Sequence, residues 1–396
     1  GWSGDGKSCA DVDECALNNG GCDLHAACKN SVGSFTCTCK SGWTGDGKTC
    51  ADVDECQTNN GGCDVNGVCT NFPGGAICTC KSGWAGDGVT CKDINECGSQ
   101  NGGCDKNATC QNTPGSNTCA CNAGWAGDGK TCADIDECQT NNGGCDPNAL
   151  CQNTPGSFGC SCKPGFVGDG KSCLMKVMII AGKQQAVATM VDVVQKVQGT
   201  LAFGAVTTFD AAVATPTLGD LAGIGGVLVF TDAEFADPVK LGDVLADYFD
   251  AGGRVVVGTF AHGNSYFGTK TPYPNGNIAG KFGDPAKGYI LITPGQQAEE
   301  LEPKNFVPVE ADSPLLKDVK SFYSNTYGYK SAGALVNGAV VVAKWGSSGQ
   351  PLVVRGVVKG RKRAELNFFP PSLYGGTTVW VGDGALLIRN ALLYSE

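Results

Sequence analysis

Residues 11–50 read DVDECALNNGGCDLHAACKNSVGSFTCTCKSGWTGDGKTC, and this stretch decides the fold of the first part of the chain. It holds six cysteines that begin at Cys15, and the same spacing begins again at Cys56, Cys97 and Cys138, 41 residues apart each time. A module of about 40 residues buries too little apolar surface to fold alone, and disulfides normally supply the missing stability. The sequence therefore predicts four copies of one small disulfide-rich module.

Cysteines and negative charge lie in the same part of the chain. The protein has 396 residues, 25 cysteines and a net charge of −10. All the cysteines precede residue 174, where acidic residues outnumber basic ones by 20 to 10, whereas the remainder is neutral at 19 to 19. So many cysteines persist as disulfides only in an oxidising compartment, which argues against a cytosolic enzyme. The sign of the charge argues against a binder of polyanions.

Six cysteines allow fifteen pairings, and their spacing does not choose among them. The phrases DVDEC, CKNSVGSFTC and CKSGWTGDGKTC, however, resemble the calcium-binding EGF-like repeat, and the resemblance covers residues 1–173. It implies that the first cysteine pairs with the third, the second with the fourth and the fifth with the sixth. The implied pairs are Cys15 with Cys28, Cys22 with Cys37, Cys39 with Cys50, Cys56 with Cys69, Cys63 with Cys78, Cys80 with Cys91, Cys97 with Cys110, Cys104 with Cys119, Cys121 with Cys132, Cys138 with Cys151, Cys145 with Cys160, and Cys162 with Cys173.

The repeats set the expected domain boundaries. GWSGDGKSC at the start of the chain matches GWTGDGKTC at residues 42–50. We therefore expect residues 1–9 to be the tail of a preceding repeat, with the partner of Cys9 upstream. The expected domains are this tail, four EGF-like repeats at 10–50, 51–91, 92–132 and 133–173, and an α/β domain at 174–396.

Oxygen-bearing side chains recur at the start of each repeat. Ca²⁺ takes six to eight oxygen ligands from carboxylates, amides and backbone carbonyls. The resemblance implies that an Asp, a Glu and an Asn of each repeat are ligands, and the alternative is that the acids only solvate a linker. The implied sets are Asp11, Glu14 and Asn30; Asp52, Glu55 and Asn71; Asp93, Glu96 and Asn112; and Asp134, Glu137 and Asn153.

Calcium at the repeat boundaries would stiffen the array and have a structural role. The family usually has an aromatic residue five positions after the Asn, which helps to pack one module on the next. Phe35 and Phe158 fit this pattern, but Ala76 and Asn117 do not. We therefore expect the second and third joints to be less rigid.

Two further motifs lie in the repeats. GWTGDGKT at 42–49 satisfies the phosphate-loop pattern, but that pattern indicates nucleotide binding only between a strand and a helix, so we expect a disulfide-closed turn. Asn107 begins an N-glycosylation sequon, and Thr109 fits the position that can carry O-linked fucose in EGF-like modules. We expect a surface glycan on the third repeat.

From residue 176 the pattern alternates apolar strands with amphipathic helices. Strands are predicted at 176–182, 225–230 and 254–258, and helices at 187–197 and after an Asp237-Pro238 start signal. This rhythm predicts a doubly wound, largely parallel α/β sheet. Further strands are predicted at 289–293, 339–345, 351–357 and 363–369, and a closing helix at 385–394.

The phrases LADYFDAGGRVVVGTFAHG, ADSPLLKDVKSF, AELNFFP and WVGDGALLIRNALL are similar to the class I glutamine amidotransferase-like superfamily in its non-enzymatic or uncharacterised branches. In active members the strand after the GG turn, here residues 254–258, ends at a sharp elbow that carries a nucleophilic Cys, with a His and an acid later in the chain, but this domain has no Cys. Its single histidine, His262, lies in the elbow loop itself. We therefore expect no catalytic residues, and we interpret the basic cluster at 359–363 as a solvated turn.

Three classes of function remain. The first is an extracellular structural protein, similar to matrix fibres and to algal or protist surface filaments such as mastigonemes, in which a calcium-stiffened rod carries a globular assembly domain. Its partners would be copies of itself or other extracellular structural proteins, and glycans. The second is an adhesion module that binds a carbohydrate or a protein. The third, a hydrolase using His262, is weakest. The negative charge makes a nucleic-acid partner unexpected. No membrane span is expected either, since no apolar run reaches about 20 residues.

Overall fold

The structure is a computed structural model of the 396-residue chain. It describes residues 1–182, 188–231, 233–261, 276–295, 297–299, 304–324, 329–346 and 348–394. Two compact units are distinguished: one comprises Gly1–Ile135 and Pro155–Ser157, and the other comprises Asp136–Thr154 and Phe158–Glu396.

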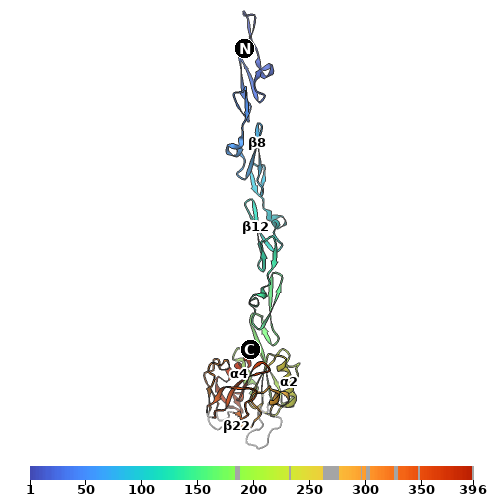
Figure 1. Ribbon diagram of the computed structural model, residues 1–396, viewed down its shortest axis with the longest axis vertical. Coiled ribbons are helices and arrows are strands. Elements are labelled where there is room, and N and C mark those ends of the chain that lie inside the picture. The colour runs from blue at the N-terminus through green and yellow to red at the C-terminus, as the bar shows by residue number, and fades with distance from the viewer. Residues whose placement is uncertain are drawn as a thin grey trace. The chain divides into compact units, whose positions relative to one another are not determined.

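Every repeat has the same elements, which the second repeat illustrates. Two short 3₁₀ helices, η3 (Glu55–Gln57) and η4 (Asn59–Gly62), precede the hairpin β7 (Gly67–Phe72) and β8 (Gly75–Cys80) and the shorter hairpin β9 (Trp84–Gly86) and β10 (Cys91–Asp93) (Figure 1). The other hairpins are β1 (Trp2–Gly4) with β2 (Cys9–Asp11), β3 (Ala26–Ser31) with β4 (Ser34–Cys39), β5 (Trp43–Gly45) with β6 (Cys50–Asp52), β11 (Ala108–Thr113) with β12 (Ser116–Cys121), β13 (Trp125–Gly127) with β14 (Cys132–Asp134), and β15 (Ala149–Thr154) with β16 (Ser157–Cys162).

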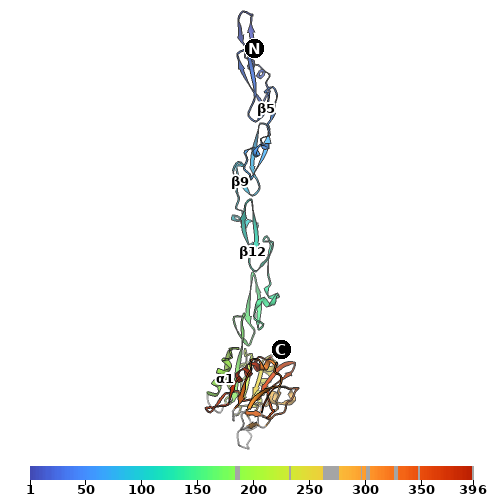
Figure 2. The same cartoon turned by 90° about the vertical axis from the view of Figure 1, so that its left-hand side faces the viewer.

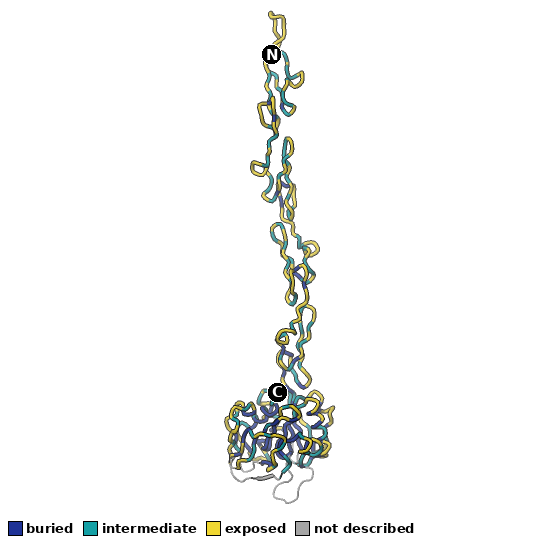
Figure 3. The backbone as a smooth tube through the Cα atoms, viewed as in Figure 1, coloured by how far each residue is buried: buried dark blue, intermediate teal, exposed yellow. Residues whose placement is uncertain are grey.

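Disulfides hold these repeats together in place of a large core. Most residues of the repeats are exposed or half-buried, whereas buried residues are concentrated in the α/β domain (Figure 3). All twelve bonds have the pairing that the resemblance implies, for example Cys56–Cys69, Cys63–Cys78 and Cys80–Cys91 in the second repeat. In these three bonds of the second repeat the two Cα atoms lie 5.4–5.7 Å apart, within the usual range for disulfides. Cys9 is free and exposed.

A mixed sheet forms the centre of the α/β domain. In the part of the chain that the structure describes it has eleven strands. Five are parallel, in the order β19 (Phe203–Asp210), β18 (Cys173–Gly182), β20 (Gly226–Thr231), β21 (Arg254–Gly258) and β28 (Arg361–Leu366). The sheet continues antiparallel through β27 (Pro351–Val358), β26 (Val340–Trp345), β23 (Lys304–Pro308), β24 (Phe322–Ser324) and β31 (Trp380–Gly382). The eleventh strand, β17 (Phe166–Gly168), pairs antiparallel with the first residues of β18. The doubly wound prediction is thus right for the parallel part.

Helices cover both faces of this sheet (Figures 1 and 2). α1 (Ala188–Gln198) and α4 (Gly384–Leu393) pack on one face, and α2 (Pro238–Asp250) packs on the other. As the sequence predicted, α2 begins at Asp237, whose carboxylate accepts a hydrogen bond from the backbone N–H of Lys240 at 2.9 Å. The remaining short elements are α3 (Gly280–Gly283), η9 (Pro285–Lys287), η10 (Pro314–Leu316), and the pairs β22 (Gln297–Glu299) with β25 (Tyr329–Ser331) and β29 (Leu373–Tyr374) with β30 (Thr377–Thr378).

The strand predicted at 289–293 is wrong. Only one isolated bridge, from Ile292 to Leu335, forms there. The backbone N–H groups of Leu291 and Ile292 instead donate to the buried carboxylate of Glu365, at 3.0 and 2.8 Å. A side chain thus supplies the acceptors that a neighbouring strand would have provided.

Candidate calcium sites at the joints between repeats

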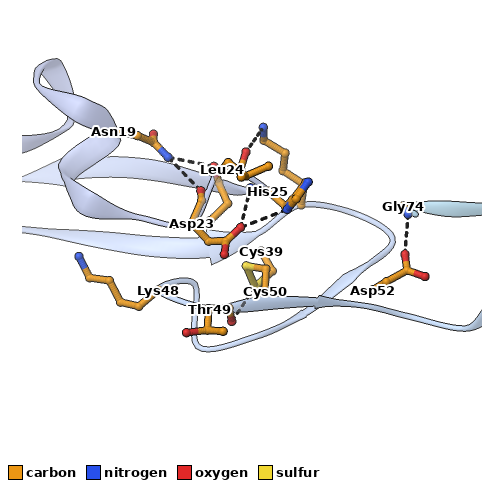
Figure 4. Close-up of polar contacts among 12 residues, drawn as sticks. Asn19, Asp23, Leu24, His25, Cys39, Lys48, Thr49, Cys50, Asp52 and Gly74 are labelled. Carbon is orange, nitrogen blue, oxygen red and sulfur yellow. Dashed lines mark hydrogen bonds and ion pairs between the residues drawn. A yellow bond between two sulfur atoms is a disulfide. The ribbon is translucent and has the colours of Figure 1, made fainter. Parts of the chain in front are cut away.

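The second repeat shows how the predicted ligands are arranged. Asp52 ends β6, Glu55 opens η3 and Asn71 lies in β7. The carboxylate of Asp52 accepts two hydrogen bonds, one from Asn71 Nδ2 at 2.8 Å and one from the backbone N–H of Gly74 at 2.5 Å. Figure 4 shows the second of these bonds. The structure therefore brings the predicted Asp and Asn into direct contact.

Two oxygen atoms of this set are buried and have no hydrogen-bond partner: Glu55 Oε2 and Asn71 Oδ1. A buried carboxylate or amide oxygen without a donor costs about 1–3 kcal/mol, so such atoms are rare in folded proteins. The same atoms recur without a partner elsewhere in the array, as Glu14 Oε2, Asn30 Oδ1, Glu96 Oε2 and Glu137 Oε2. All of them are acceptors, and a bound cation would satisfy them.

The first and third repeats reproduce the contacts of the second. Asn30 Nδ2 donates to Asp11 at 2.9 Å, and Asn112 Nδ2 donates to Asp93 at 2.7 Å. The N–H groups of Gly33 and Gly115 donate to the same two carboxylates, each at 2.5 Å. In the fourth repeat Asp134 accepts from Gly156 N at 2.5 Å, Glu137 opens η7 (Glu137–Gln139), and Asn153 lies in β15.

Hydrogen bonding favours the charged form of two of these carboxylates. The N–H of Gly33, with the Asn30 amide, lowers the pKa of Asp11 below its usual value. The N–H of Gly115, with the Asn112 amide, lowers the pKa of Asp93 in the same way. A hydrogen bond to the charged form favours that form. Both groups are therefore in the state that binds a metal.

The second acid of each DVDEC phrase has a different role. Asp54 Oδ1 accepts from the backbone N–H of Cys56 at 3.1 Å, and Asp54 Oδ2 accepts from Gln57 Nε2 at 3.0 Å. Asp54 therefore caps η3, as Asp13 and Asp136 cap the equivalent turns of their repeats. These acids are occupied by the fold, which agrees with their omission from the predicted ligand sets.

The residues present suit an ion that prefers oxygen. Each set offers two carboxylates and one amide oxygen, the donor types that Ca²⁺ takes. Among the described residues there is no group of three or more His, Cys, Asp or Glu side chains placed to hold a metal. A site with only two carboxylates therefore needs amide and backbone oxygens to complete its shell.

The same turns also join one repeat to the next. Gly74 lies against the indole of Trp43 in the preceding repeat, and a Cβ built on Gly74 would fall 2.9 Å from Trp43 Nε1. Trp43 is in turn the cross-strand neighbour of Asp52, whose carboxylate binds the N–H of Gly74. One glycine turn thus contacts both the predicted ligand and the aromatic ring. The same pairs recur as Trp2 with Gly33, Trp84 with Gly115 and Trp125 with Gly156.

This geometry corrects the predicted role of the aromatic position after the Asn. Phe35 packs within its own repeat, where Lys48 Nζ lies 4.3 Å from the ring centroid and Gly20 lies against the ring edge. In the third repeat Asn117 occupies that position and donates to the carbonyl of Gly102 at 2.9 Å. The expectation of looser second and third joints was therefore based on the wrong residue, because the tryptophans form the joints.

The 41-residue register continues into the α/β domain with changed chemistry. Phe166 stands where the earlier repeats have Trp, and Met175 stands where they have the first ligand Asp. These two residues are cross-strand neighbours in β17 (Phe166–Gly168) and β18. Met175 is only 2% exposed in the core of the α/β domain, and Phe166 packs against that core. The last hairpin of the fourth repeat is therefore part of the α/β sheet, with an apolar pair in place of the calcium ligand.

The structure also places the phosphate-loop motif and the two predicted glycosylation residues. The sequence GWTGDGKT comprises β5 and the turn that leads into β6, where Asp46 Oδ1 accepts from the N–H groups of Lys48 and Thr49, so a strand and not a helix follows it. Thr109 is exposed, and its hydroxyl donates to Asn122 Oδ1 at 2.7 Å, while Asn107 is half-buried. His262 lies outside the described residues.

Comparisons with known proteins agree with the repeats. The family described as EGF domain matches residues 15–50, 56–91, 97–132 and 138–173. Nidogen-2 of Mus musculus is 50% identical over 42 residues, which are 11% of this chain and 3% of nidogen-2. Nidogen-1 of Mus musculus is 45% identical over 42 residues, 11% of this chain and again 3% of the relative. This chain thus spans a small fraction of either nidogen.

Solved structures similar to the chain match over about half of it. A ThuA-like protein from Parabacteroides merdae is 12% identical, with a TM-score of 0.35, and the match covers 55% of this chain and 88% of that one. A ThuA-like protein from Bacteroides uniformis is 15% identical, also with a TM-score of 0.35, over 55% of this chain and 89% of that one. At these scores the likeness assigns no function to the α/β domain.

The EGF domains and twelve disulfides indicate an extracellular protein. Among the described residues, no helix is both long and apolar enough to cross a membrane.

Proposed function

We propose that this chain is an extracellular structural protein whose EGF repeats bind Ca²⁺ at their boundaries and whose α/β domain mediates assembly, as a subunit of a cell-surface or extracellular filament. The observation that carries the calcium part is the recurrence of buried, unpartnered acceptor oxygens beside a hydrogen-bonded Asp. In the second repeat these atoms are Glu55 Oε2 and Asn71 Oδ1.

Calcium in these sites has a mechanical role. Asp52 and Glu55 belong to the segment that links two disulfide-closed modules, and Asn71 belongs to the second module. An ion held by all three fixes the linker to the hairpin, next to the contact of Trp43 with Gly74. Extracellular modules of this kind bind with dissociation constants of about 10⁻⁴–10⁻³ M. Four ions would add eight positive charges and nearly cancel the net charge of −10.

Calcium binding is tested by calorimetric titration of the full chain and of an Asn71→Ala variant. The variant loses Oδ1, so we expect one site fewer, or one site at least about tenfold weaker, because a tenfold change corresponds to about 1.4 kcal/mol. Asn66→Ala is the matched control, since Asn66 lies in the same repeat outside the predicted ligand set. Equal titrations for all three proteins would contradict the assignment.

The proposed assembly role rests on the amino-acid composition of the α/β domain, which lacks the Cys nucleophile of active amidotransferase-like proteins. The α/β domain has no Cys, so we propose that it is not an enzyme and that its partners are copies of itself, other extracellular structural proteins and glycans. A glycan on Asn107 or Thr109 would lie on the third repeat. Electron microscopy of the purified chain at physiological calcium tests assembly. Fibres are expected, and dispersed monomers alone would refute the filament.

A further inference from the structure

A cavity of about 200 Å³ lies at the amino-terminal edge of the parallel sheet. β21 and β28 pair at Val257 with Glu365 and at Gly258 with Leu366, toward their carboxyl ends. The cavity lies beside their amino ends, where the lining includes the basic side chains Arg254, Arg361, Lys362 and Arg363 and the rings of Phe249 and Tyr394. Among the described residues, none of those that line it is acidic.

Two of the four basic groups are held by the fold, although the buried Nη2 of Arg363 has no hydrogen-bond partner. Arg363 is buried and forms an ion pair with the buried Glu365, at 2.6 Å between Nη1 and Oε1. Arg361 donates to the carbonyls of Phe249, in the last turn of α2, and of Gly252 and Gly253, just beyond the helix, where a cation is favoured. The interpretation of 359–363 as a solvated turn is therefore wrong for both arginines.

Arg254 and Lys362 remain available. The half-buried guanidinium of Arg254 contacts the Leu392 carbonyl at 3.4 Å and the sulfur of Met175, neither of which carries a negative charge. Burial, with repulsion from Arg361, lowers the pKa of Arg254, as expected for a cation that lacks a counter-charge. Lys362 is exposed at the rim. Both side chains can offer N–H donors to a ligand in the cavity.

Two larger hollows continue from this cavity. One of about 380 Å³ shares Arg254 and Gly252 with it, and one of about 520 Å³ shares Lys362 and Tyr394. The second hollow adds Lys317 and Arg389, and its one acidic group, Asp318, is held by Arg389 at 3.0 Å. We call the three hollows together the basic trough. Basic side chains outnumber acidic ones along it, although the domain as a whole is neutral.

We propose that the basic trough binds an acidic polysaccharide, with sulfate or carboxylate groups held by Arg254 and Lys362. A guanidinium presents a planar fork of donors that matches the oxygens of such groups. The trough is longer than a single anion requires, and Tyr394 offers a ring beside two of its hollows. Acidic polysaccharides are polyanions that an extracellular protein meets. The net charge of −10 argues against a polyanion binder for the chain as a whole, but the acidic excess lies in the repeats and the α/β domain that holds the trough is neutral.

A second copy of the chain is a less suitable occupant. The acidic repeats have the complementary charge, but many of their carboxylates are occupied: Asp46, Asp87, Asp128 and Asp169 each accept backbone N–H groups in their own turns. The cavity between β21 and β28 is also narrow, since about 200 Å³ admits one ring substituent and excludes a disulfide-closed module. Size therefore favours a sugar chain.

The test is fluorescence anisotropy of the full chain with three labelled oligosaccharides: a sulfated dextran, a hyaluronan fragment that carries carboxylates, and neutral dextran. We expect binding of one or both acidic sugars and none of neutral dextran, with an affinity that falls as salt rises. The double variant Arg254→Gln/Lys362→Gln should bind at least about tenfold more weakly, which corresponds to about 1.4 kcal/mol.

Two further variants keep the test decisive. Lys362→Glu changes only an exposed side chain, so it should fold normally and still weaken binding severalfold. Lys240→Gln/Lys287→Gln removes the same charge from exposed positions outside the trough and should leave binding unchanged. The proposal is overturned if no acidic sugar binds, if the trough variants bind within twofold of the parent, or if the control pair loses as much. It is also overturned if the trough variants disrupt only the association of copies.

Discussion

The substitution Gly74→Ala tests the packing contact between the first and second repeats. A control variant measures the conformational cost of placing a side chain in such a turn. Gly74 has a φ of +87°, and a Cβ there would fall 2.9 Å from Trp43 Nε1. The positive φ alone costs a side chain about 1–2 kcal/mol. The overlap with the indole adds about 1–3 kcal/mol, because the ring must move from a packed position. The joint between the first and second repeats should therefore open more often.

The matched control is Gly62→Ala in the same repeat. Gly62 has a φ of +78°, but no atom lies within 4 Å of the position of its Cβ. This variant carries the conformational cost without the overlap. The difference between the two variants isolates the packing of Trp43 on the turn.

Amide hydrogen exchange measures the opening. The N–H of Val53 donates to the Gly42 carbonyl at 2.9 Å, beside the joint. With 1.4 kcal/mol for each factor of ten, Gly74→Ala should speed exchange at Val53 by about five- to hundredfold relative to Gly62→Ala. Adding Trp43→Ala should remove most of this difference, as expected for two residues in contact. Equal exchange at Val53 in the two alanine variants would refute the assigned role of Trp43.

Three further predictions concern the α/β domain and the turns. Phe166→Ala should destabilise the α/β domain by about 2 kcal/mol through lost packing, measured by urea unfolding, and an unchanged midpoint would contradict the apolar joint. Glu365→Gln should cost about 3–5 kcal/mol in the same assay because Arg363 is left buried without a counter-charge, and a neutral result would contradict that pairing. Hydrogen bonds lower the pKa of Asp93, so they stabilise the folded third repeat. This stabilisation should be complete at pH values above the unfolded pKa of about 3.9 and should be lost as the pH falls through the folded pKa. Thermal unfolding of the third repeat from pH 6 to pH 2 checks this, and a transition independent of pH would exclude it.

The repeats could be predicted almost completely from the sequence. The resemblance implied the twelve pairs and placed Asp52 and Asn71 in one ligand set, and the structure brings these two side chains into contact. The joints were assigned to the wrong ring because the family pattern points to the position of Phe35, which is not aromatic in every repeat, whereas the position of Trp43 is aromatic in each repeat. The series of tryptophans spaced 41 residues apart continues as Phe166, where the α/β sheet begins. This regular continuation is the signal that distinguishes the Trp position from the Phe position.

The α/β domain was predictable in its parallel half, where buried strands read as apolar runs. Long-range side-chain contacts were not visible in the sequence. The segment around Leu291 is apolar like a strand, but its N–H groups bind Glu365, which lies far along the chain. The role of Arg254 was missed for the same reason, since only the fold brings it beside Lys362.

Calcium-dependent exchange at the linkers tests the central claim most directly. Linker amides of the full chain are compared with calcium and with a chelator. We predict that calcium slows amide hydrogen exchange in the segments 51–55, 92–96 and 133–137, because each of these linkers supplies an Asp and a Glu. Exchange at 174–177 should not change, because Met175 replaces the Asp there. Linkers that are insensitive to calcium, or an equal response at Met175, would contradict it.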